Sequence, residues 1–190
     1  MANNDTLSPI LDALYHGRRD DAQRLLEAVG VETLSVHEAA AMGVVPRLTV
    51  LLDAEPSTAN AWSSDGFQPL GLACFFGRRE AAELLLSRGG EINTPARHPF
   101  HVTALHAALA SPDPDFAAQL IAAGADVNAR QQGGATPLHE TAHSGYLDLT
   151  RLLLEHGADP SATDDRGQTP AEVAIARGHP DVAALLTGAA

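Results

Sequence analysis

Lysine, cysteine and aromatic residues are absent or scarce in this sequence of 190 residues. It contains no lysine, so all 12 basic residues are arginine, and 24 acidic residues bring the formal net charge to −12. A surface this acidic repels phosphate groups, which disfavours nucleic acids and anionic membranes as partners. The only cysteine, Cys74, has no intramolecular partner for a disulfide, so a reducing compartment and a small buried core position are expected for it.

Long apolar runs are also missing, and none is sufficient to cross a bilayer. The segment Met1–Ser8 lacks the basic and then apolar pattern of a secretory signal, so a cytoplasmic location is expected. Hydrophobic residues make up 45% of the chain but aromatic residues only 4%, so the core must consist mainly of Leu, Ala and Val. Side chains of this size suit closely packed helix pairs.

What the sequence does contain is an internal repeat. The tetrapeptide Thr136-Pro137-Leu138-His139 has degraded copies at Gln68-Pro69-Leu70-Gly71, Thr103-Ala104-Leu105-His106 and Gln168-Thr169-Pro170-Ala171. The residues that match its leucine are Val36, Leu70, Leu105, Leu138 and Ala171, at intervals of 34, 35, 33 and 33 residues. A period near 33 indicates a repeated supersecondary unit that buries its apolar face only by stacking on its neighbours.

The parts of one unit can be assigned from their chemistry. Thr136 can cap a helix and Pro137 suits the first helical position. Gly145 is expected to end this first helix in a left-handed conformation. A second helix then carries the apolar cluster 152–154, and the polar segment 158–168 suits a projecting hairpin, called a finger here, that leads to the next unit.

These motifs resemble those of the ankyrin-repeat family over almost the whole chain. The resemblance implies an all-α solenoid of about six helix-turn-helix units joined by hairpin-like fingers, within a single domain of residues 1–190. The expected units are an N-terminal cap at 7–30, four repeats at 31–63, 64–98, 99–131 and 132–164, and a C-terminal cap at 165–190. The ankyrin resemblance also implies a non-enzymatic monomer that binds a protein partner in the concave groove of fingers and first helices. No cofactor or metal is expected.

Aromatic residues indicate where on this groove the partner binds. The chain has only 5 Phe, 2 Tyr and 1 Trp, yet four of these residues fall at groove-facing or finger positions of a single unit. The predicted partner-binding residues are Trp62, Phe67, Phe75 and Phe76, rimmed by Met42, Arg97 and Phe100. Large aromatic side chains on a rigid groove make effective interface anchors. The alternative is that Phe67 and one other phenylalanine fold inward and fill the gap left by Gly71.

Two other functions stay open at this point. The stretch His139-Glu140-Thr141-Ala142-His143 satisfies the His-Glu-x-x-His pattern of zinc hydrolases. However, His37 and His106 match His139 in units that have no second histidine four places later, and the resemblance implies that this histidine binds backbone groups at the base of the fingers. The other possibility is an accessory protein that regulates or stabilises an enzyme. The identity of the partner cannot be read from the sequence.

Overall fold

The computed structural model describes residues 7–110 and 112–188. Within these ranges the chain forms twelve α-helices and no β-strand, which confirms the predicted all-α fold. Residues 1–6, on which the expectation of no secretory signal mainly rests, lie outside the described ranges, as do the last two residues of the expected C-terminal cap. The chain divides into two compact units, residues 1–91 and 92–190.

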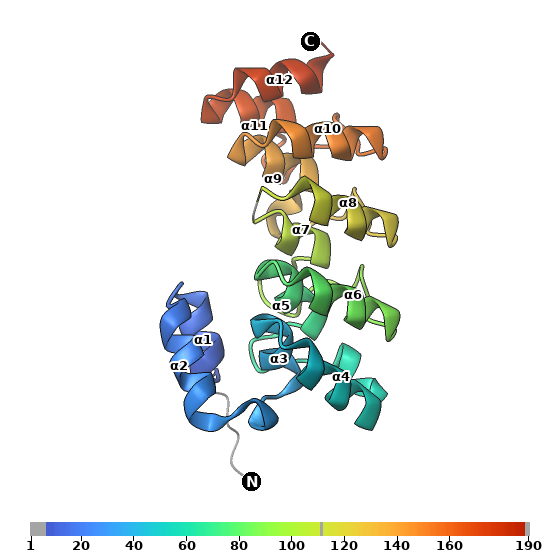
Figure 1. The fold of residues 1–190 in the computed structure, drawn as a ribbon. Coiled ribbons are helices and arrows are strands. Elements are labelled where there is room, and N and C mark those ends of the chain that lie inside the picture. The colour runs from blue at the N-terminus through green and yellow to red at the C-terminus, as the bar shows by residue number, and fades with distance from the viewer. Residues whose placement is uncertain (1–6, 111, 189–190) are drawn as a thin grey trace. The chain divides into compact units, whose positions relative to one another are not determined.

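The first compact unit contains three helix pairs (Figure 1). Their bounds are α1 Pro9–Tyr15, α2 Arg19–Val29, α3 Val36–Met42, α4 Val45–Ala54, α5 Pro69–Phe75 and α6 Arg79–Ser87. Short 3-10 turns occur at η1 (Val31–Thr33) and η2 (Pro56–Asn60). The pair α3/α4 stacks on the pair α5/α6, so that α3 contacts α5 and α4 contacts α6.

The second compact unit also contains three helix pairs. Their bounds are α7 Ala104–Ala108, α8 Pro114–Ala122, α9 Pro137–Ser144, α10 Leu147–Glu155, α11 Pro170–Arg177 and α12 Pro180–Thr187, with a 3-10 turn η3 at Gln132–Gly134. First helices α7, α9 and α11 pack on one another in that order, and second helices α8, α10 and α12 do the same. Each pair therefore buries its apolar face against the next pair.

The repeat motif sets the helix ends as the sequence predicts. Pro137 and Pro170 are the first residues of their helices. Thr169 forms a reciprocal capping box, in which its hydroxyl accepts from the backbone N–H of Glu172 and its own N–H donates to the Glu172 carboxylate. First helices α9 and α11 both end at a glycine with positive φ, 72° at Gly145 and 82° at Gly178. Glycine accepts this conformation without the steric cost that a Cβ atom would bring.

Leucines fill the core between the helix pairs. The largest side chains that are almost completely buried are Leu34, Leu48, Leu52, Leu70, Leu72, Leu85, Leu105, Leu109, Leu120, Leu138, Leu149 and Leu153. Cys74 is a small buried core residue, as expected, and burial raises the pKa of its thiol. The scarcity of aromatic residues is thus matched by a core of closely packed aliphatic side chains.

An asparagine in each of three fingers ties that finger to the following helix pair. In the second compact unit, Asn128 donates to the Gly157 carbonyl (3.1 Å) and accepts from the Asp159 N–H (2.8 Å). Asn93 makes the same two bonds one repeat earlier, to Gly124 (2.9 Å) and Asp126 (2.8 Å). In the first compact unit, Asn60 donates to the Gly89 carbonyl at 3.0 Å in the same way. The glycine carbonyls are acceptors just beyond the C-terminus of each second helix, and the N–H groups of Asp126 and Asp159 are donors that follow them.

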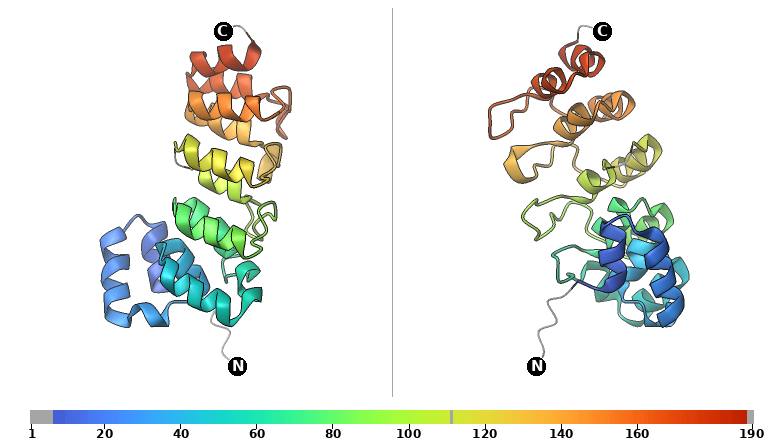
Figure 2. Two further views of the ribbon diagram at one scale, coloured as in Figure 1. Left: turned by 45° about the vertical axis from the view of Figure 1, so that its right-hand side comes forward. Right: turned by 90° about the vertical axis from the view of Figure 1, so that its left-hand side faces the viewer.

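The helices α1 and α2, called the N-terminal helix pair below, occupy a different place from the other pairs of the first compact unit. The sequence predicts a cap, which would stack on the end of the array. The structure places the pair beside α3, on the side away from α4 (Figures 1 and 2). Leu11 and Leu14 are buried in α1, and Leu26 is buried in α2. The pair therefore lies on the side of the first compact unit that the first helices α3 and α5 form.

Candidate functional site

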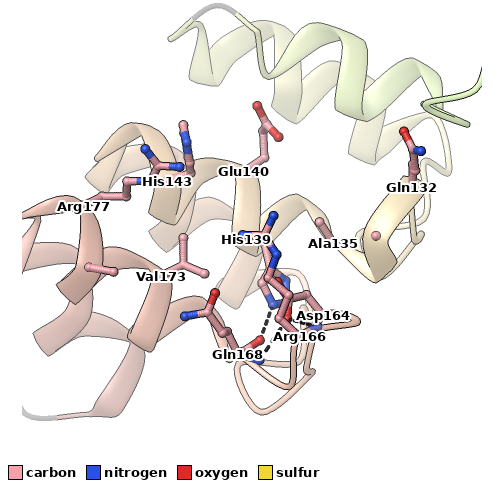
Figure 3. Close-up of a pocket in the computed structure, with 12 residues that line it drawn as sticks. Gln132, Ala135, His139, Glu140, His143, Asp164, Arg166, Gln168, Val173 and Arg177 are labelled. Carbon is pink, nitrogen blue, oxygen red and sulfur yellow. Dashed lines mark hydrogen bonds between the residues drawn. The ribbon is translucent and has the colours of Figure 1, made fainter.

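The fingers and first helices of the second compact unit line a hollow of about 530 Å³ (Figure 3). Its lining comes from the fingers at Gln132, Gly133, Ala135, Asp164, Arg166 and Gln168, and from α9 and α11 at His139, Glu140, His143, Val173, Ala176 and Arg177. Charged and polar side chains dominate this list. The residues just before the glycine that ends each first helix, such as His143 and Arg177, face the hollow as the resemblance implies.

Asp164 shapes the finger at one wall of this hollow. Its carboxylate accepts from the N–H groups of Gln168 and Arg166, each at 2.9 Å. These bonds, first of all the one from Gln168, hold the pKa of Asp164 below its ordinary value. The carboxylate of Asp164 therefore stabilises the turn of the finger.

His139 uses both of its ring nitrogens to join the finger to the helix. The N–H of Thr136 donates to Nδ1 (3.1 Å), so this nitrogen carries no proton, and Nε2 donates to the carbonyl of Gln168 (2.9 Å). The side chain is buried, whereas His143 is exposed. Among the described residues, no three His, Cys, Asp or Glu side chains are grouped so that they could hold a metal ion. The arrangement matches the role that the ankyrin resemblance implies for this histidine.

The equivalent histidines of two other units each share one of the two contacts that His139 makes. His37 lies 2.9 Å from the Ala61 carbonyl through Nε2, and His106 lies 2.9 Å from the Thr103 hydroxyl through Nδ1. Burial lowers the pKa of His37, and it lowers the pKa of His106 to about 4. Both imidazoles are consequently neutral near pH 7.

Three of the four aromatic residues predicted to bind a partner come together in the first compact unit. Phe75 and Phe76 are in edge-to-face contact at a centroid distance of 5.0 Å, with Phe75 42% exposed. Tyr15 of α1 contacts both rings and also Phe67, at centroid distances of 6.0, 5.4 and 6.4 Å for Phe75, Phe76 and Phe67. We refer to Tyr15, Phe67, Phe75 and Phe76 as the aromatic cluster. Sequence reasoning missed Tyr15, because α1 carries neither the repeat motif nor a preceding finger.

Phe67 has a structural role in addition. A Cβ atom placed on Gly71 would lie 3.8 Å from the Phe67 ring, so this ring lies over the glycine as the packing alternative expects. Its backbone is held by the Ser63 hydroxyl, which accepts from the Phe67 N–H (3.0 Å) and lies 2.9 Å from its carbonyl oxygen. Phe67 thus belongs to the base of the finger and also contacts Tyr15.

The remaining predicted residues have different positions. Trp62 is half-buried in the finger before α5, and Met42 is half-buried at the end of α3 beside Gly77 and Arg78. Arg97 and Phe100 belong to the second compact unit. Phe100 is 59% exposed and packs on His98 at a centroid distance of 4.8 Å.

Comparison with known proteins supports the repeat pattern. A model for ankyrin repeats in three copies matches residues 104–190, the range that holds α7 to α12. A search of curated proteins gave no significant match. In the described part of the chain, no helix combines the length and apolar character needed to cross a bilayer. Ankyrin repeats generally mediate interactions between proteins, and the family consists typically of non-enzymatic scaffolds. Residues 104–190 of this chain therefore carry ankyrin repeats.

Proposed function

We propose that the chain is a non-enzymatic, monomeric and cytoplasmic module that binds a protein partner on the face formed by its fingers and first helices. The contact residues that we propose in the first compact unit are Met42, Trp62, Phe67, Phe75 and Phe76. The exposure of Phe75, at 42%, is the observation that carries the proposal. This ring lies within an aromatic cluster on a rigid helical face, where such side chains bury a large area and lose few rotamers on binding.

Charge and shape define the class of partner. The net charge of −12 favours a partner segment that carries basic residues. In the second compact unit, the equivalent face is hollowed, which supports its use for binding an extended or helical segment. Arg97 and Phe100 stay predictions as further contact residues. If the partner is an enzyme, the same surface would make this chain its regulatory or stabilising subunit.

Selection from a displayed peptide library against the full-length protein tests the proposal. We expect enrichment of peptides that combine aromatic and basic residues. One enriched peptide should lose about 30-fold in affinity, by titration calorimetry, when Trp62→Ala or Phe76→Ala removes an anchor worth about 2 kcal/mol. Thr163→Ala is the matched control, because Thr163 holds a finger position equivalent to that of Trp62, and we expect it to change affinity less than about threefold.

Melting temperatures decide between binding and packing. If the two aromatic variants bind the peptide normally and melt much earlier than the parent protein, the aromatic cluster only supports the finger base. The proposed site would then be wrong.

Zinc content tests the hydrolase alternative. Because both ring nitrogens of His139 are engaged by Thr136 and Gln168, we expect protein prepared without a histidine tag to hold much less than one zinc ion per chain. Elemental analysis measures this directly. One zinc per chain that disappears in His143→Ala, together with peptidase activity, would overturn the non-enzymatic proposal.

A further inference from the structure

The N-terminal helix pair covers part of the surface proposed for the partner. Within the first compact unit, α1 and α2 lie beside α3, on the side away from α4 (Figure 2). Tyr15, the last residue of α1, brings its ring to within 5.4 to 6.4 Å of the rings of Phe67, Phe75 and Phe76, measured between centroids. A helix from another protein that used these rings as anchors would have to take the place of α1.

A polar contact accompanies the ring contacts of Tyr15. Its hydroxyl donates to Oδ2 of Asp65 at 2.8 Å, and Oδ1 of Asp65 accepts from the Ser63 hydroxyl. Because Ser63 is also bonded to the backbone of Phe67, the finger fixes the position of the Asp65 carboxylate. Burial, and then the bond to Asp65, raises the pKa of Tyr15, so its hydroxyl stays protonated as a donor. The site therefore offers an apolar surface with one fixed acceptor at its edge.

We propose that α1 is a tethered substitute for the partner, and that the partner is a helical segment whose tyrosine replaces Tyr15. This inference rests on the proposed function and deepens it, since it identifies the side chain that the site accepts. The incoming ring contacts Phe67, Phe75 and Phe76, and its hydroxyl donates to Asp65. The net charge of −12 favours basic residues beside that tyrosine in the partner.

Four residues of α1 are buried, Ile10, Leu11, Ala13 and Leu14, so the pair is held to α3 mainly through α1, and α2 and η1 contribute little. Only Ala22 and Leu26 of α2 are buried, and none of the residues of η1 is buried. Val29 is 48% exposed at the end of α2. Gly30, with φ of 85°, then connects α2 to η1. Segments with few buried apolar contacts open at a lower free energy than the core does. Release of α1 and α2 would leave the stacked leucines of α3 to α6 in place.

A covered site binds more weakly than an open one. The measured dissociation constant equals the intrinsic constant divided by the fraction of molecules in which the site is uncovered. Weakening the cover must therefore tighten binding of an external ligand, whereas damage to the site must weaken it. The two effects have opposite signs, which makes them separable.

The first test measures how peptide affinity depends on Tyr15. A tyrosine-containing helical peptide with basic flanking residues is titrated into full-length protein. We expect Tyr15→Ala, which removes three ring contacts and the bond to Asp65, to tighten binding about tenfold. Tyr15→Phe removes only the hydroxyl and should tighten binding about threefold. Tyr146→Phe is the control, since the only other tyrosine of the chain lies in the second compact unit, and it should leave affinity unchanged.

Hydrogen exchange of the parent protein provides the second readout. Peptide binding should release the protected amides of α1 to faster exchange and leave those of α9 and α10 unchanged. Unchanged protection of α1, or weaker binding in Tyr15→Ala, would overturn the tethered-substitute proposal, because Tyr15 would then be absent from the site or part of the docking surface itself. If Trp62→Ala and Phe76→Ala bind the peptide as tightly as the parent protein does, the proposed site itself fails, and that result does not depend on Tyr15.

Discussion

Replacing Leu153 with alanine should lower the free energy of unfolding by about 2–5 kcal/mol. Leu153 lies in α10, has no exposed surface and belongs to the core between neighbouring helix pairs. Its truncation removes buried methyl groups and leaves a cavity that the closely packed helices fill only in part. Denaturant melts followed by circular dichroism measure the change.

Leu152 is the matched control for this substitution, because it lies on the same helix but is only half-buried. Leu152→Ala should lower the free energy of unfolding by less than half as much as Leu153→Ala, since less of the Leu152 side chain is buried in the folded protein. If Leu153→Ala changed the free energy of unfolding by less than about 0.5 kcal/mol, its assignment to the core would be wrong.

Acidification should destabilise the protein through His106. Burial lowers the pKa of this imidazole from 6.5 to about 4, although the Ala135 carbonyl and the Asp126 carboxylate favour protonation. Above pH 6.5 the side chain is neutral in both states, and its contribution to stability is complete. Between pH 6.5 and pH 4 the unfolded chain binds a proton that the folded chain does not, so stability falls as the pH falls. The loss due to His106 should reach about 2 kcal/mol at about pH 5.

Urea melts at about pH 7.5 and about pH 5 measure this dependence. His106→Gln should remove most of the His106 share of the loss, because glutamine does not titrate. His156→Gln is the control for the same substitution at an exposed position. An identical pH dependence in the parent protein and in His106→Gln would contradict the effect of burial on this histidine.

The repeat motif predicts local structure well for a physical reason. A threonine or serine cap, a proline at the first helical position and a glycine with positive φ each specify the backbone within a few residues, and the structure confirms them at Thr169, Pro137 and Gly145. The role of His139 at the base of the finger was implied by the ankyrin resemblance, and its bonds to Thr136 and Gln168 match that role.

The position of the N-terminal helix pair could not be predicted in this way. An amphipathic helix pair needs an apolar surface to cover, and the end of the stack and the first-helix face both offer one. No cap, finger or glycine in residues 7–30 discriminates between these two surfaces. As a result, the contact of Tyr15 with the predicted partner-binding residues emerged only from the structure.

The asparagine bonds of the fingers have a consequence for synthesis of the protein. Asn93 and Asn128 each bond to backbone groups that follow them by only 29 to 33 residues. Since these ties join sequence neighbours, a growing polypeptide can complete each one as soon as about one further repeat has left the ribosome. Helix pairs would then be added to a folded stack in the order of translation, with little unprotected apolar surface at any stage.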